Sequence, residues 1–207
     1  IFDPSYADFG MGDALSHINV GQTGFNFTRR DGDSIWWTSN NMNGFRARAV
    51  YIMGPAGNAA SDPSGTQMGL DYTSGPLMVG VSQANYEDYA DNGGAVGTAG
   101  SEAKMTTLRG SYDMGMATIK VGKWTIEQSG LAGATTGFEV EGSSIYVGMP
   151  VGGGLLWAQS SSLGDQDSTT VAGTAAIDQS GRSSYDVGFH MPMNANVTMF
   201  VRYGETE

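Results

Sequence analysis

Two glutamates close together in the sequence are the residues that could most readily do chemistry. Glu139 and Glu141 are two positions apart, and a pair of carboxyl groups flanking one bond is the machinery of glycoside hydrolysis. On a β-strand, however, residues i and i+2 point to the same side, so this spacing also describes a charged, water-facing surface. We favour the second interpretation, because residues with this spacing on a strand line one wet face. Elsewhere in the sequence no nucleophile and base stand together.

Metal sites are also poorly supported. The segments Asp91–Gly93 and Asp165–Asp167 resemble the start of calcium loops, but the remaining ligands are missing at the required spacing. The two histidines, His17 and His190, are far apart, and the chain has no cysteine, which excludes thiolate zinc sites and disulfides. We therefore expect no cofactor, no structural metal and no enzymatic activity.

The composition favours a β-rich protein. Glycine accounts for 32 of 207 residues, roughly twice its usual share of about 7%. The mean hydropathy is slightly negative, and no run approaches the roughly 18 apolar residues that a membrane-spanning helix needs. The formal net charge of −11 argues against a nucleic-acid partner, which requires a basic surface.

The elements that position the charged residues are strands, because apolar and polar residues alternate with period two between turn-forming clusters. Met68, Leu70 and Tyr72 alternate with Gln67, Gly69 and Asp71, for example. The alternation predicts ten strands, at 33–39, 45–54, 66–73, 77–87, 103–113, 117–127, 138–149, 154–163, 183–191 and 197–204.

The connections between these strands alternate in length. The short ones are 40–44, 74–76, 114–116, 150–153 and 192–196, and the long ones are 55–65, 88–102, 128–137 and 164–182. In a meander of antiparallel hairpins every second connection lies on the same rim. Short turns on one rim and long loops on the other are typical of an up-and-down transmembrane β-barrel.

In such a barrel the apolar faces meet lipid and the charged faces meet a water-filled lumen, since a charge at the lipid midplane costs about 2–4 kcal/mol. Lys120 and Lys123 cannot share a face, so one must lie near a rim or past a bulge. The predicted pore-lining residues are Arg46, Arg48, Asp71, Arg109, Asp113, Lys120, Glu139, Glu141, Asp186 and Arg202.

Aromatic residues cluster near the predicted strand ends, among them Tyr51, Tyr72, Tyr185 and Tyr203. Girdles of aromatic side chains at the two membrane interfaces would have this distribution. The alternative is that aromatic residues are simply enriched in strands.

Four segments together resemble the general porins of Gram-negative bacteria, especially the β-proteobacterial type. They are DGDSIWWTSNNMNGFRARAVYIMGP (31–55), MGLDYTSGPLMVGVSQANYED (68–88), LRGSYDMGMATIKVGKW (108–124) and YDVGFHMPMNANVTMFVRYGETE (185–207). Each resembles one hairpin of the family. The first departs from the family pattern by carrying Trp36 and Trp37 and by lacking a proline.

The resemblance implies an outer-membrane barrel of about 16 strands, usually a homotrimer, set in lipid and lipopolysaccharide and passing ions and small hydrophilic solutes. Ten strands are fewer than such a barrel needs, so we expect the chain to be a segment of a longer protein, with barrel hairpins at 31–207. By position, residues 1–30 resemble the family's constriction loop. Asp3, Asp8 and Asp13 would then face a basic wall of Arg46, Arg48 and Arg109.

Two hypotheses follow from the sequence. The first is a diffusion porin of the outer membrane. The second is a β-rich structural or adhesive cell-surface protein without channel activity, which would share the richness in Gly, Ser, Thr and Asn. The two differ in whether the alternating faces divide into a lipid-facing apolar side and a wet polar side.

Overall fold

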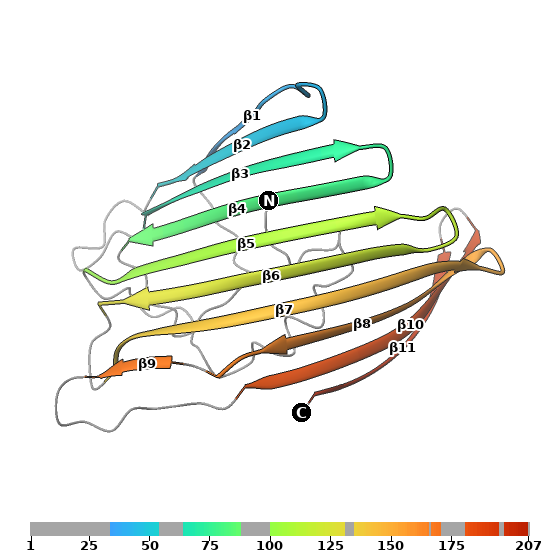
Figure 1. The fold of residues 1–207 in the computed structure, drawn as a ribbon. Helices are drawn as coiled ribbons and strands as arrows, with labels where there is room; N and C mark the ends of the chain where they lie inside the picture. Colours follow the sequence, from blue (N-terminus) through green and yellow to red (C-terminus); the bar gives the residue numbers. More distant parts are fainter. Residues whose placement is uncertain are drawn as a thin grey trace.

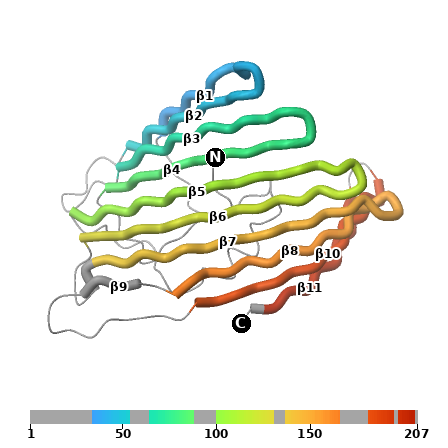
Figure 2. Tube along the Cα trace, viewed as in Figure 1, coloured from blue at the N-terminus to red at the C-terminus, as the bar shows by residue number. Residues whose placement is uncertain are grey.

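The fold is that of a computed structural model, which describes residues 34–53, 64–87, 100–130, 135–165, 167–170, 181–194 and 197–206. These residues form a single antiparallel sheet that curves, so that β10 and β11 turn behind β8 (Figures 1 and 2). Neighbours in the sheet are neighbours in the sequence, except that the short β9 pairs with β7 and β10 follows β8.

The sheet contains eleven strands. Their bounds are β1 Ser34–Thr38, β2 Phe45–Ile52, β3 Ser64–Ser74, β4 Leu77–Glu87, β5 Glu102–Asp113, β6 Thr118–Ser129, β7 Thr135–Val151, β8 Gly154–Leu163, β9 Asp167–Thr170, β10 Arg182–Asn194 and β11 Val197–Thr206. The ten predicted strands are confirmed, and so is the up-and-down antiparallel topology. The four-residue β9, which lies in a segment predicted to be loop, was missed.

The hairpin turns form where the sequence predicts short connections. Met42 and Phe45 exchange backbone hydrogen bonds of 2.8 and 3.1 Å around Asn43 and Gly44, which both have positive φ, at 55° and 94°. Two central residues with positive φ define the turn whose twist matches that of antiparallel strands, and Asn-Gly is its preferred sequence. We call the strand ends beside these short turns the turn half, and the opposite ends the loop half.

The two faces of the sheet differ in what they carry. The face holding Asp71, Trp124 and Asp186, here called the inward face, is mostly buried. The outward face, which holds Val79, Ile145 and Val187, exposes a continuous band of large apolar side chains in the turn half. The band contains Met68, Leu70, Leu77, Val79, Val81, Leu108, Val121, Ile145, Val147, Met149, Val151, Leu156, Val187 and Val201.

The outward face changes character along each long strand. On β7 the outward residues of the turn half are Ile145, Val147, Met149 and Val151, whereas those of the loop half are Glu139, Glu141 and Ser143. A tilted crossing of the hydrocarbon layer needs about 9–11 residues, and β7 has 17. The extra length accounts for a polar outward surface in the loop half.

The inward face changes in the opposite sense. Its loop half carries an apolar, buried cluster in which Trp124 is 1% and Ile126 0% exposed. The cluster consists of Val50, Ile52, Tyr86, Ala103, Trp124, Ile126, Phe138, Val140 and Leu163. The sequence-based expectation of a uniformly wet inward face is therefore wrong for this half, and the charged inward residues gather in the other.

Aromatic pairs border the outward apolar band on both sides. Phe45 and Tyr72 lie beside the turns with ring centroids 4.6 Å apart. Tyr185 and Tyr203 lie toward the loop half, 6.3 Å apart. These two pairs lie at the levels where the girdles expected from the sequence would run. In the part of the chain that is described, no helix is long and apolar enough to cross a membrane.

Gly142→Ala should destabilise the fold, because an added Cβ would lie 2.2 Å from the Trp124 ring. Displacing a fully packed indole costs about 1–3 kcal/mol. Gly110→Ala is the matched control, since its Cβ would meet neighbours only at 3.5 Å or more. Urea unfolding followed by tryptophan fluorescence measures both variants. Equal stability of the two would contradict the packing described here.

Candidate functional site

An aspartate surrounded by arginines forms the first charged cluster of the inward face. Arg109 on β5 donates through Nη2 to Oδ1 of Asp71 on β3 at 2.5 Å, and Nη2 of Arg48 on β2 lies 3.8 Å from Oδ2. Both carboxylate oxygens thus face a guanidinium. Asp71 is 8% exposed, so the pairing compensates for the removal of its charge from water.

A glycine makes this ion pair possible. Asp71 and Arg109 are two strands apart, and Gly80 of the intervening β4 is paired in register with both. A Cβ at Gly80 would lie 2.3 Å from Oδ1 of Asp71 and 2.8 Å from Nε of Arg109. Because Gly80 has no side chain, the two charged groups meet across its backbone.

A second cluster has the same construction on the last two strands. Arg202 on β11 donates to Oδ1 of Asp186 on β10 through Nε at 2.9 Å and Nη2 at 2.8 Å. Gln159 on β8 donates to Oδ2 at 3.2 Å. Gly204 lies opposite Asp186, and a Cβ there would lie within 1.9 Å of Oδ1.

Between these clusters lies a cation on an aromatic ring. Nζ of Lys120 on β6 is 5.0 Å from the ring centroid of Tyr146 on β7, and the ring of Tyr146 stacks on Trp157 with centroids 6.3 Å apart. A cation over an aromatic face is attracted by the ring quadrupole. Lys120 therefore continues the row of inward basic groups across the middle of the sheet.

The structure places eight of the predicted pore-lining residues on the inward face. They are Arg46, Arg48, Asp71, Arg109, Asp113, Lys120, Asp186 and Arg202. Asp113 stands apart from the others, because it lies at a short turn, where its Oδ1 accepts the amide of Gly115 at 2.8 Å.

Glu139 and Glu141 are corrections to the sequence-based prediction. Both lie on the outward face of β7, on the same side as Ile145 and opposite to the charged clusters. The prediction assumed that each face keeps one polarity along a whole strand, and β7 changes polarity at Ser143. Lys123, the lysine that could not share a face with Lys120, lies outward and pairs with Glu141 at 3.0 Å.

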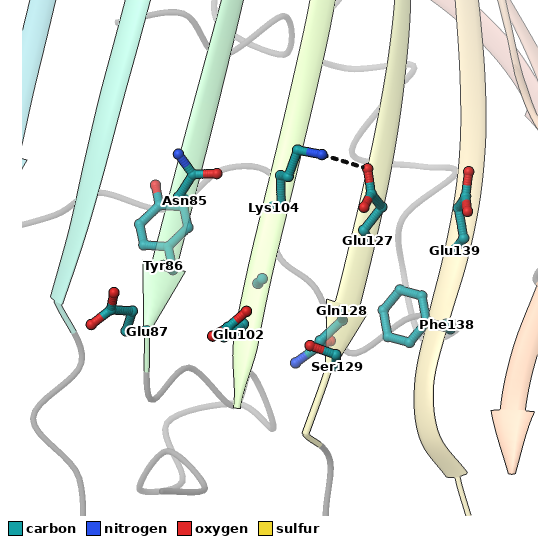
Figure 3. Close-up of a pocket in the computed structure, with 11 residues that line it drawn as sticks. Asn85, Tyr86, Glu87, Glu102, Lys104, Glu127, Gln128, Ser129, Phe138 and Glu139 are labelled. Atoms are coloured by element: carbon teal, nitrogen blue, oxygen red, sulfur yellow. Dashed lines mark hydrogen bonds and ion pairs between the residues drawn. The ribbon is translucent and has the colours of Figure 1, made fainter. Parts of the chain in front are cut away.

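A recess of about 610 Å³ lies at the loop-half ends of β4, β5, β6 and β7 (Figure 3). Its charged lining consists of Glu87, Glu102, Glu127, Glu139 and Lys104. Lys104 pairs with Glu127 at 2.9 Å. The glutamates also lie opposite one another in register, Glu87 with Glu102 and Glu127 with Glu139. Opposed like charges are destabilising. Within the described ranges no group of acidic or histidine side chains could hold a metal ion.

Comparison with known proteins identifies similar folds but no close relative. No family model and no curated protein sequence matches the chain. Among solved structures, OmpT in a trimer form, an outer membrane protein of Vibrio cholerae, matches with a TM-score of 0.66 and 18% identity, over 84% of this chain and 54% of that one. Its loop L8 deletion mutant matches with a TM-score of 0.68, 16% identity and coverages of 84% and 57%.

A porin structure refined at 1.8 Å resolution also matches, with a TM-score of 0.62 and 14% identity, over 83% of this chain and 55% of the porin. The chain has the fold of an outer-membrane β-barrel wall. It spans little more than half of the length of each of these neighbours. The fold that the four sequence segments implied is thereby confirmed, while identities this low establish the fold alone.

The predicted constriction-loop residues Asp3, Asp8 and Asp13 lie outside the described residues. The long loops predicted between the strands fall mostly outside them as well. The clusters around Asp71 and Asp186 are thus the main charged sites on the inward face of the described strands.

Asp71→Asn should be strongly destabilising, because Arg109, which is 9% exposed, would lose its carboxylate. Breaking one partner of a buried ion pair costs about 3–5 kcal/mol. Asp113→Asn, which also removes one carboxylate from the inward face but at an exposed turn, should cost under about 1 kcal/mol. Denaturant midpoints of the refolded variants test this, and a loss at Asp113 equal to that at Asp71 would argue against the ion-pair account.

Proposed function

We propose that the protein is a diffusion porin of the Gram-negative outer membrane, which passes ions and small hydrophilic solutes through a water-filled barrel. One observation carries the proposal, namely the polarity of the turn half. There the outward face is apolar and exposed, and the inward face carries the charged clusters of Asp71 and Asp186. A protein that folds in water has the reverse arrangement.

The exposed band is too extensive for an ordinary water-soluble surface. Contiguous apolar patches beyond a few hundred Å² mark membrane or partner interfaces, and this band crosses β3 to β11. Lipid hydrocarbon can cover an apolar surface of this extent. The aromatic pairs at the two borders of the band lie where the lipid interfaces would be. Lipid and lipopolysaccharide are therefore the surroundings that we propose for the outward face.

The rival hypothesis of a structural or adhesive surface protein explains the composition but not this polarity. Exposed apolar side chains such as Val79, Ile145 and Val187 would not stabilise a sheet with water on both sides. Among the described residues the geometry gives no support to enzymatic activity, since the carboxylate pair suggested by the sequence, Glu139 and Glu141, lies on the outward face beside Lys123.

The assembly and the constriction remain parts of the proposal. A homotrimer is supported by the trimer form of the similar OmpT structure. We also propose that residues 1–30 form a loop that narrows the pore, which the resemblance of the sequence to general porins supports. In this arrangement Asp3, Asp8 and Asp13 face Arg46, Arg48 and Arg109. The basic side of that arrangement lies on the inward face of β2 and β5.

Single-channel recording in planar bilayers tests the function directly. The purified protein should produce stepwise, ohmic conductance that persists without any energy source. Insertion into the bilayer, verified by protease protection, without any conductance would contradict the proposal.

The position of the hydrocarbon layer can be tested on one strand. Val147→Arg should lower the free energy of unfolding in lipid vesicles by about 2–4 kcal/mol, as lipid-facing arginines do. Ser143→Arg, four residues away on the same face, should change it by less than about 1 kcal/mol, because Ser143 belongs to the polar loop half. Equal penalties at both positions would show that the boundary is misplaced.

A further inference from the structure

The sign of the charges differs between the two faces of the sheet. Among the described residues, the outward charges are mostly acidic, with Lys104 and Lys123 as the basic exceptions. The outward acids are Glu87, Glu102, Glu127, Glu139, Glu141 and Glu205. The inward bases are Arg46, Arg48, Arg109, Lys120, Arg182 and Arg202, against Asp71, Asp113 and Asp186. The net charge of −11 for the chain thus says little about its inward face.

The inward charges are also layered by depth. Asp71 and Asp186 are 8% and 3% exposed, and each lies over a glycine of the neighbouring strand. Arg109 is nearly as buried as Asp71, at 9% exposed, whereas the side chains of Arg48 and Arg202 are 25% and 24% exposed. Asp71 and Asp186 are therefore less accessible than Arg48 and Arg202, and away from the exposed turn of Asp113 the accessible inward charges are mostly basic.

Arg46 is the clearest member of this surface. It lies directly opposite Asp71 in register, yet both oxygens of Asp71 already face Arg109 and Arg48. Arg46 is exposed and forms no ion pair within the described residues. Its positive charge is consequently not cancelled by a neighbour on the described strands, and it acts on solutes that pass this part of the wall.

We propose that this wall makes the pore selective for anionic solutes, an inference that rests on the proposed porin function. Pore-lining charge rings set which ions enter, and low-dielectric walls focus the field of such charges into the lumen. The buried aspartates hold the arginines in position and offset part of their charge. The described inward face keeps a basic excess, because its six basic residues outnumber Asp71, Asp113 and Asp186. Small carboxylates, phosphate and chloride are the class of solute that the wall favours.

The test is the reversal potential of the open channel in planar bilayers under a gradient of potassium chloride. The wild-type protein should give the sign of a chloride-preferring pore. Arg46→Gln should lower the chloride-to-potassium permeability ratio by about twofold to threefold, the effect of one unpaired charge a few ångströms from an ion in partly screened water. Arg46→Glu should lower it further.

Lys104→Gln is the matched control. It also removes one positive charge from an exposed position, but on the outward face, where Lys104 pairs with Glu127. It should leave the permeability ratio unchanged. Because Arg46 and Lys104 are both exposed, neither substitution opens a cavity, and unchanged single-channel conductance steps would confirm intact barrels.

The outcomes separate the two proposals. A conducting channel that prefers potassium, or an equal shift for Arg46→Gln and Lys104→Gln, would overturn the anion selectivity while leaving the porin function in place. Inserted protein without conductance would overturn the porin function and the selectivity together.

Discussion

Hydrocarbon accepts apolar side chains and rejects charges, and the arrangement of this sheet follows from that one constraint. A β-strand presents every second residue to each side, so a wall in contact with lipid must place its charges on the other side. The turn half obeys this rule on every long strand. The loop half does not, and on β7 the reason is its length of 17 residues, which exceeds the roughly 9–11 that a tilted crossing of the hydrocarbon layer requires. Its polar outward surface and buried inward cluster have the polarity of a sheet that stands in water.

A second physical requirement determines where the inward charges lie: a buried carboxylate needs a positively charged partner. Because Gly80 and Gly204 have no side chains, Asp71 and Asp186 can reach arginines on other strands across them. The same bonds that compensate the aspartates fix the guanidinium groups in place. The ion pairs and the proposed selectivity depend on the same residues, so a change in either cluster should affect both. Arg46, which takes no part in the pairing, is free of that coupling.

Much of this architecture could be predicted from the sequence, because period-two alternation and turn residues are local signals. The ten strands and the inward position of Asp71, Arg109, Asp186 and Arg202 follow from them. The outward position of Glu139 and Glu141 could not be predicted by assigning one polarity to each face, since the boundary of the membrane is not written into the alternation. The sequence does contain a signal for it, because the odd-numbered residues of β7 change from charged, at Glu139 and Glu141, to apolar, at Ile145 and Val147. The short β9 and the glycine that joins Asp71 to Arg109 depend on register, which only the paired strands reveal.

The central claim, that lipid meets the turn half of the outward face and water meets the loop half, can be measured residue by residue on β7. The chain has no cysteine, so single cysteines at 139, 141, 143, 145, 147, 149 and 151 can carry a spin label in reconstituted vesicles. Collision rates with oxygen, which partitions into lipid, and with a water-soluble nickel complex report the surroundings of each label. We expect nickel accessibility at 139–143 and oxygen accessibility at 145–151, with the change between Ser143 and Ile145. Uniform accessibility to the nickel complex along all seven positions would contradict the account.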